Sequence, residues 1–170
     1  GLAHYIIHAY DEPALASRAK EAARRYGMIA PSTPHALHMP SHTFTRIGDW
    51  QASIDTNAAS AAAARAAHQP ADLLHASDYM VYAYLQTAQD ESAKQLVDSS
   101  EKVFTDFDPA HATGAAPASA AYYAHAAIPA RYFLERQAWA GAATLKPLNS
   151  PFPYANAITY FARGLGAAHG

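Results

Sequence analysis

The sequence predicts an all-α protein. Alanine dominates long stretches such as residues 58–67, and alanine favours the helix more than any other residue. The spacing His-x-x-x-His occurs twice, at His4/His8 and at His38/His42. An interval of 34 residues separates the equivalent histidines of the two motifs, which indicates a repeated helical unit.

The first expected helix pair comprises residues 2–10 and 13–27. The segment Asp11-Glu12-Pro13 breaks the first helix and supplies the acidic first turn and early proline that favour the start of the second. Within the second helix, alanines recur at roughly helical spacing opposite a stripe of charged side chains, so one face can be buried.

The second expected pair comprises residues 34–47 and 49–68. Gly48 lies between them, and glycine permits a tight turn between antiparallel helices. Pro40 falls inside the first helix of this pair, where a proline removes one backbone hydrogen bond and should kink the helix. Pro129 has the equivalent position in a later helix and should act in the same way.

Two further pairs and a single helix follow. The expected helices are 71–89 with 90–107, 118–136 with 138–145, and 154–169 alone. Residues 111–117 are expected to form an extended loop. Because the last helix has no partner, we expect exposed apolar side chains at Ile158, Tyr160 and Phe161, covered in a homodimer or by missing flanking repeats. The chain starts without methionine inside a first helix, which suggests a piece of a longer protein.

The turn of the second pair carries the most specific motif, Phe44-x-x-x-Gly48-Asp49-Trp50-x-x-Ser53-Ile54, and the same frame recurs around Ala88 and Gln137. This frame resembles the tetratricopeptide repeat, a helix-turn-helix unit of 34 residues. The resemblance implies a right-handed α-solenoid and a single helical repeat domain over residues 1–170. The two histidine motifs are also similar to an uncharacterised bacterial subgroup of these repeat proteins, from which no activity carries over.

Composition excludes several classes of partner and site. The formal net charge is −2 and no Lys/Arg-rich run occurs, which argues against nucleic acid or an anionic membrane surface as a partner. No apolar run approaches the roughly 20 residues of a membrane span. The chain has no cysteine, so disulfides and thiolate metal sites are excluded. The absence of cysteine is compatible with both the cytoplasm and the periplasm, and we expect a soluble bacterial protein in one of these compartments.

The resemblance implies a ligand groove on the first helix of each pair. In such repeats the second, fifth and ninth positions of that helix recurrently contact ligands. Counting back from the turns at Gly48, Ala88 and Gln137, and applying the 34-residue offset to the first pair, places these residues in the groove: His4, His8, His35, His38, His42, His75, Asp78, Tyr82 and Arg131. Imidazole and phenol groups therefore dominate the expected surface, whereas a peptide clamp would favour Lys, Asn and Arg.

The histidines permit a metal site. Histidines four residues apart on a helix can converge on one ion, and a neighbouring helix about 8–10 Å away can add a further ligand. We therefore consider Zn²⁺ or another transition metal held by His4, His8, His38 and His42, with Asp11 or Asp78 as a carboxylate ligand. Alternatively, the histidines form hydrogen bonds with tyrosine hydroxyls and backbone carbonyls and hold no metal.

The leading functional hypothesis is a non-enzymatic binding scaffold for a protein, a peptide or a small ligand. A metal-binding protein and an interaction module of a larger enzyme are the alternatives. Ser41 lies between His38 and His42, but adjacent residues of a helix point about 100° apart, so a nucleophile activated by a neighbouring imidazole is not expected. We therefore predict no catalytic residue.

Overall fold

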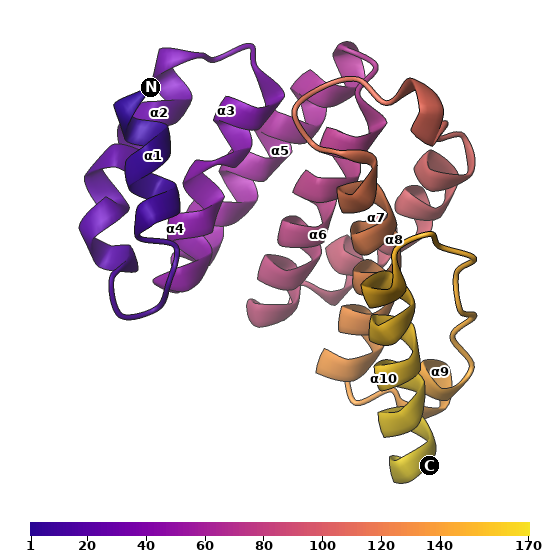
Figure 1. The fold of residues 1–170 in the computed structure, drawn as a ribbon. Coiled ribbons are helices and arrows are strands. Elements are labelled where there is room, and N and C mark those ends of the chain that lie inside the picture. The colour runs from indigo at the N-terminus through magenta and orange to yellow at the C-terminus, as the bar shows by residue number, and fades with distance from the viewer.

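The computed structural model describes residues 1–170, which fold into helices without any strand (Figure 1). The predicted all-α class is therefore confirmed. None of the helices combines the length and apolarity needed to cross a lipid bilayer.

The first pair consists of α1 (Leu2–Ala9) and α2 (Lys20–Ile29), with the short 3-10 helix η1 (Ala16–Ala19) between them. The expected start of the second helix at Pro13 was wrong. The carbonyl of Glu12 accepts hydrogen bonds from the backbone amides of both Leu15 and Ala16, which closes a local turn instead of the first turn of a helix. The continuous helix begins only at Lys20.

The second pair consists of α3 (Pro34–His38), α4 (Pro40–Arg46) and α5 (Trp50–Ala66). The expected helix 34–47 is thus divided at Met39, immediately before Pro40. Proline has no amide hydrogen to donate to the preceding turn, so the predicted distortion at Pro40 is confirmed. Pro129, in contrast, lies inside a helix that continues through it.

The remaining helices complete two further pairs and the terminal helix. They are α6 (Pro70–Gln86), α7 (Asp90–Thr105), η2 (Pro109–His111), α8 (Ala118–Glu135), α9 (Trp139–Ala143) and α10 (Pro153–His169). Consecutive helices pack on one another, and α6 also packs on α8, as α8 does on α10. Each of these pairs follows the preceding one along the molecule (Figure 1).

The turns within the last three pairs share one backbone geometry. Gly48, Ala88 and Gln137 have positive φ angles of 73°, 56° and 53°. In each turn the following amide donates to a carbonyl five residues earlier, over 2.8–2.9 Å. The sequence frame that predicted these turns is therefore matched by equivalent geometry. His68, at 54°, forms a fourth turn of this type, between α5 and α6, that the frame did not predict.

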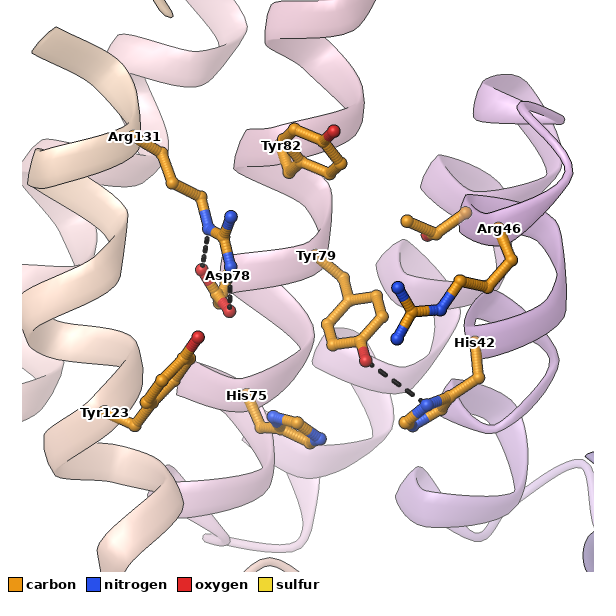
Figure 2. A pocket seen from close by; sticks show the side chains of 9 residues that line it. His42, Arg46, His75, Asp78, Tyr79, Tyr82, Tyr123 and Arg131 are labelled. Atoms are coloured by element: carbon orange, nitrogen blue, oxygen red, sulfur yellow. Dashed lines mark hydrogen bonds and ion pairs between the residues drawn. The ribbon is translucent and has the colours of Figure 1, made fainter. Parts of the chain in front are cut away.

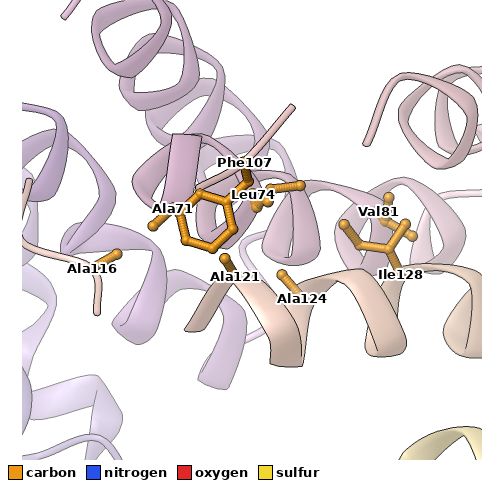
Figure 3. Close-up of a cluster of buried hydrophobic side chains, with 8 residues drawn as sticks. All are labelled: Ala71, Leu74, Val81, Phe107, Ala116, Ala121, Ala124 and Ile128. Carbon is orange, nitrogen blue, oxygen red and sulfur yellow. The ribbon is translucent and has the colours of Figure 1, made fainter. Parts of the chain in front are cut away.

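The largest apolar core lies between α6 and α8 (Figure 3). Leu74 and Val81 of α6 face Ala121, Ala124 and Ile128 of α8, and alanine at these positions allows the two helices to approach closely. Phe107 and Ala116, from the segments that join α7 to α8, cover the same cluster. This packing holds α6 and α8 in the relative position that the site requires.

The last helix presents apolar side chains to solvent, as expected. Tyr160 is 58% exposed and Phe161 is 64% exposed, while Ile158 is partly buried. The predicted apolar surface is therefore confirmed for the two aromatic residues.

Candidate functional site

Six of the ten histidines gather on neighbouring helices in two groups. We name His38, His42 and His75 the inner triad, and His4, His8 and His35 the outer triad. Within each triad, one nitrogen from every imidazole lies within 4.8 Å of the others. The expected set of His4, His8, His38 and His42 is thus shared between two separate groups, each completed by another histidine.

The division between the triads falls within α3, between His35 and His38. His35 and His38 lie on α3, whereas His42 lies on α4. The ring of His35 has its centroid 5.1 Å from that of His4 on α1, while the ring of His38 lies 4.3 Å from that of His75 on α6. One short helix therefore contributes to both triads.

His38 is held in one tautomer by a buried amide. Its Nδ1 lies 2.7 Å from Oδ1 of Asn57, and both residues are almost completely buried. The amide nitrogen of Asn57 donates to the carbonyl of Ser53 over 2.8 Å, so its oxygen must face the imidazole. Because that oxygen can only accept, Nδ1 of His38 carries the proton, and Nε2 of the neutral ring has a lone pair.

His42 is oriented in the same way by a carboxylate. Its Nδ1 lies 2.8 Å from Oδ2 of Asp11, and the other carboxylate oxygen accepts a hydrogen bond from Nε of Arg46 over 2.8 Å. These bonds from His42 and Arg46 outweigh burial and hold the pKa of Asp11 well below its ordinary value. An ionised carboxylate only accepts, so Nδ1 of His42 donates and Nε2 of the neutral ring has a lone pair.

The two lone pairs face one another. Nε2 of His38 and Nε2 of His42 lie 3.1 Å apart. With both Nδ1 protons committed to Asn57 and Asp11, neither Nε2 of the neutral rings can donate to the other, and the contact is repulsive without a cation. Two nitrogens bound at about 2.0–2.1 Å to one tetrahedral Zn²⁺ lie about 3.3 Å apart, close to the distance observed.

Two of the three imidazoles of the inner triad resist protonation. Burial, with a smaller effect from His75 and His42, places the pKa of His38 well below its ordinary value. Burial, followed by the neighbouring His42 and His35, lowers the pKa of His75 to about 4. His38 and His75 are therefore neutral near pH 7, which is the form in which an imidazole can bind a metal ion.

Tyr79 covers the inner triad. Its ring lies edge-on to His38 and His75, with centroids 4.9 and 5.5 Å away, and 5.1 Å from that of His42. Its hydroxyl is 3.2 Å from Nδ1 of His42. Burial, and then the nearby Asp11 and Asp78, raises the pKa of Tyr79, so the phenol keeps its proton.

A cavity of about 500 Å³ opens beside the inner triad (Figure 2). It is lined by His42, Thr45, Arg46, His75, Asp78, Tyr79, Tyr82, Tyr123 and Arg131. Of these, His42, His75, Asp78, Tyr82 and Arg131 were predicted from repeat positions. The others were not predicted, because Thr45, Arg46, Tyr79 and Tyr123 fall outside the second, fifth and ninth positions of their helices.

Asp78 does not join the histidines. It is 2% exposed and accepts a hydrogen bond from Nε of Arg131 over 2.8 Å. Burial raises the pKa of Asp78, and Arg131 opposes that change. Burial disfavours the charge of Arg131, but Asp78 more than compensates and raises the pKa of the guanidinium overall. Asp78 thus anchors Arg131, and Asp11 is the carboxylate that reaches the inner triad.

The outer triad is more open and has fewer polar partners. His8 is exposed, and the one hydrogen bond to a ring nitrogen joins Nδ1 of His4 to the hydroxyl of Tyr26 over 3.2 Å. Burial, followed by His8 and His35, lowers the pKa of His4. The pKa of His35 is lowered as well, first by burial, although Asp72 raises it.

Ser41 cannot act on a ligand in this cavity. Its side chain is fully buried, and its hydroxyl lies 3.5 Å from Nδ1 of His38, the nitrogen already bonded to Asn57.

Comparison with known proteins identifies no relative. No family model matches this chain, and no curated protein or solved structure matches it significantly. The assignment of a function therefore depends on the geometry of the two triads and the cavity.

Proposed function

We propose that the protein is a non-enzymatic binding scaffold that holds a divalent transition metal ion between His38, His42 and His75. The observation that supports this proposal is the 3.1 Å contact between two Nε2 atoms whose rings both donate through Nδ1. A cation placed between these atoms and near His75 converts a repulsive contact into two coordinate bonds.

The bonds around the triad fit a metal ligand set. Metal-binding histidines usually donate their second ring N–H to a carboxylate or another acceptor, which fixes ring orientation and raises ligand basicity. Asp11 and Asn57 occupy these roles for His42 and His38. Imidazole ligands without thiolates suit Zn²⁺ well, and three protein ligands leave the fourth tetrahedral position open.

We also propose that the helices form a right-handed α-solenoid of the tetratricopeptide type. Three features support this proposal: consecutive pairs pack in order, α6 packs on α8 and α8 on α10, and the turns at Gly48, Ala88 and Gln137 share one geometry. In this arrangement α1, α3, α4, α6 and α8 are the first helices of the pairs, and these helices supply all six histidines and the lining of the cavity.

A metal-free groove is the second candidate. The observation in its favour is the set of phenol groups, Tyr79, Tyr82 and Tyr123, that line the cavity with two arginines. In this case the histidines would form hydrogen bonds directly with a protein, peptide or small ligand.

Elemental analysis separates the two candidates. The protein is purified without a histidine tag, its metal content is measured, and Zn²⁺ and Co²⁺ are titrated into the metal-free form. We expect one tightly bound ion and, with Co²⁺, the intense visible absorption of a tetrahedral site. His75→Gln should remove this ion, whereas His111→Gln, at a histidine that is 84% exposed and far along the chain, should not. Absence of both native metal and a tight titration would overturn the metal proposal.

A further inference from the structure

Two arginines on the cavity wall keep free hydrogen-bond donors. Arg46 donates through Nε to Asp11, and Arg131 donates through Nε to Asp78, each over 2.8 Å. Arg46 makes no other hydrogen bond within the protein, and Nη1 of Arg131 makes none. Figure 2 shows the two guanidinium groups on opposite sides of the cavity, with Tyr79 between them. Each aspartate therefore fixes an arginine and leaves terminal N–H groups for another acceptor.

The charge of the cavity depends on the metal. Arg46 and Asp11 cancel in formal charge, as do Arg131 and Asp78, and imidazoles bind a metal ion in their neutral form. A divalent ion on the inner triad therefore gives the region an excess of two positive charges. A bound cation is usually the largest local charge of a site and decides which ligands it attracts.

The open coordination position adjoins this cavity. His38 is buried, whereas His42 and His75 line the cavity wall. An ion bound to all three histidines thus has protein on the side of His38 and the cavity on the side of the other two. The cavity of about 500 Å³ lies in the lower half of the range of small-molecule sites, about 300–1,000 Å³.

We infer that this cavity binds a small organic anion, one of whose carboxylate or phosphate oxygens occupies the fourth position of the metal. This inference rests on the proposed metal site. The remaining oxygens of the anion accept hydrogen bonds from Arg46 and Arg131, and the body of the ligand lies among the tyrosines. Arginine suits this role because its planar group presents several donors in the geometry of carboxylate and phosphate. The scaffold therefore takes a small molecule and not a peptide.

The inference is tested with Co²⁺-loaded protein, whose visible absorption reports on the coordination sphere. Malonate and inorganic phosphate are titrated separately, which distinguishes a carboxylate from a phosphate ligand. At least one of the two should change the absorption in a saturable manner. Calorimetry with the same anion should show binding to metal-loaded protein at least about tenfold tighter than to metal-free protein.

Variants separate anion binding from metal binding. Arg131→Lys keeps a positive charge opposite buried Asp78 but loses the planar fork, and Arg46→Gln alters a more exposed side chain. Each should weaken anion binding by about tenfold while the Co²⁺ absorption without anion is retained. Arg24→Gln, at an exposed arginine of α2 outside the cavity, is the matched control and should bind the anion as the unaltered protein does.

The outcomes distinguish the two proposals. If Co²⁺ gives tetrahedral absorption that neither anion changes, the anion inference is overturned and the metal site stands. If no metal binds, the proposed metal function fails, and the inference that depends on it fails too. Equal affinity of the metal-loaded and metal-free protein for the anion would show that the metal is not a ligand of the anion, which also overturns the inference.

Discussion

The inner and outer triads contain the same three side chains but differ in what surrounds them. In the inner triad, His38 and His42 each direct Nδ1 to an acceptor, Asn57 or Asp11, and the rings pack against Tyr79. In the outer triad, His8 is exposed and only His4 has a polar partner, the hydroxyl of Tyr26. Two members of the inner triad, His38 and His42, are therefore oriented by an amide and a carboxylate, and no member of the outer triad has such a partner.

This difference shows that histidine spacing alone does not determine whether the imidazoles are oriented by other side chains. Both triads include a pair of histidines four residues apart, His4 with His8 and His38 with His42. The groups that orient the inner pair lie 19 and 31 residues away in sequence, on other parts of the chain. Ligand orientation lowers the entropic cost of binding an ion, so we expect the inner triad to bind much more tightly.

The largest expected effect separates the triads by affinity. His75→Gln should weaken Zn²⁺ binding by more than about 100-fold, because it removes a ligand. Loss of a residue that only orients a metal ligand typically lowers metal affinity by about 10–100-fold. His8→Gln should leave the tight binding step unchanged, because His8 belongs to the outer triad. A competition titration with a chromophoric chelator measures both affinities.

The same two variants should also differ in how much Zn²⁺ raises their unfolding temperature. Zinc at about 100 times its Kd adds about 2.7 kcal/mol to the stability of a protein that binds it only when folded. The unfolding temperature of the unaltered chain and of His8→Gln should therefore rise with Zn²⁺, and that of His75→Gln should not. A loss of the tight step in His8→Gln but not in His75→Gln would reverse the comparison between the triads.

The second prediction concerns pH in the absence of metal. The pKa values of His38 and His75 lie below the unfolded value of about 6.5, so the unfolded chain takes up protons first as the pH falls. The free energy of unfolding should be highest above about pH 6.5 and should fall towards about pH 4, by about 1.4 kcal/mol per pH unit for each such group.

Urea unfolding in the presence of a chelator measures this slope. His75→Gln removes a largely buried contributing group and should reduce the slope more than His8→Gln does, because His8, whose pKa is also lowered by burial, is exposed and solvent screens its interactions. Parallel pH profiles for the unaltered chain and His75→Gln would show that His75 is solvated in the folded state, contrary to the structure.

Much of the fold was predictable from local patterns. The helical class, the order of the pairs and the turns at Gly48, Ala88 and Gln137 follow from alanine content, proline and glycine breaks and a short repeated frame. The start of α2 was missed because Asp11-Glu12-Pro13 is a good helix start by composition, whereas Glu12 is used in a turn that frees Asp11 to reach His42. The composition rule for helix starts therefore failed at the segment that brings Asp11 to the inner triad.

The candidate site was predictable only in part. Counting from the turns, together with the 34-residue offset for His4 and His8, identified all six histidines, and it also identified Asp78, Tyr82 and Arg131. It could not divide the histidines into triads, because that division depends on contacts between helices, of His35 with His4 and of His38 with His75. It also could not find Asn57 on α5, since a buried asparagine in an alanine-rich helix has no signal until its partner is known.

The third prediction tests the orienting carboxylate. Asp11→Asn keeps an acceptor near His42 but removes the charge that favours donation from Nδ1, so Zn²⁺ affinity should fall by about tenfold. Tyr26→Phe removes the only polar partner of the outer triad and should leave the tight step unchanged. Because Asp11 also bonds Arg46, the Arg46→Gln variant serves as a control for loss of that second bond.

The smallest expected effect concerns which group accepts the proton of His42. Nδ1 lies 2.8 Å from Asp11 and 3.2 Å from the hydroxyl of Tyr79, and a single N–H favours the nearer, charged acceptor. Tyr79→Phe keeps the ring that packs against all three histidines of the inner triad and removes only the hydroxyl. Zn²⁺ affinity should therefore change by less than about threefold, well below the effect of Asp11→Asn. A larger loss in Tyr79→Phe than in Asp11→Asn would mean that the phenol orients His42 and that Asp11 serves Arg46 alone. In that case Nε2 of His42 could carry the proton, the contact with Nε2 of His38 would become an ordinary hydrogen bond, and the main support for a metal between them would be lost.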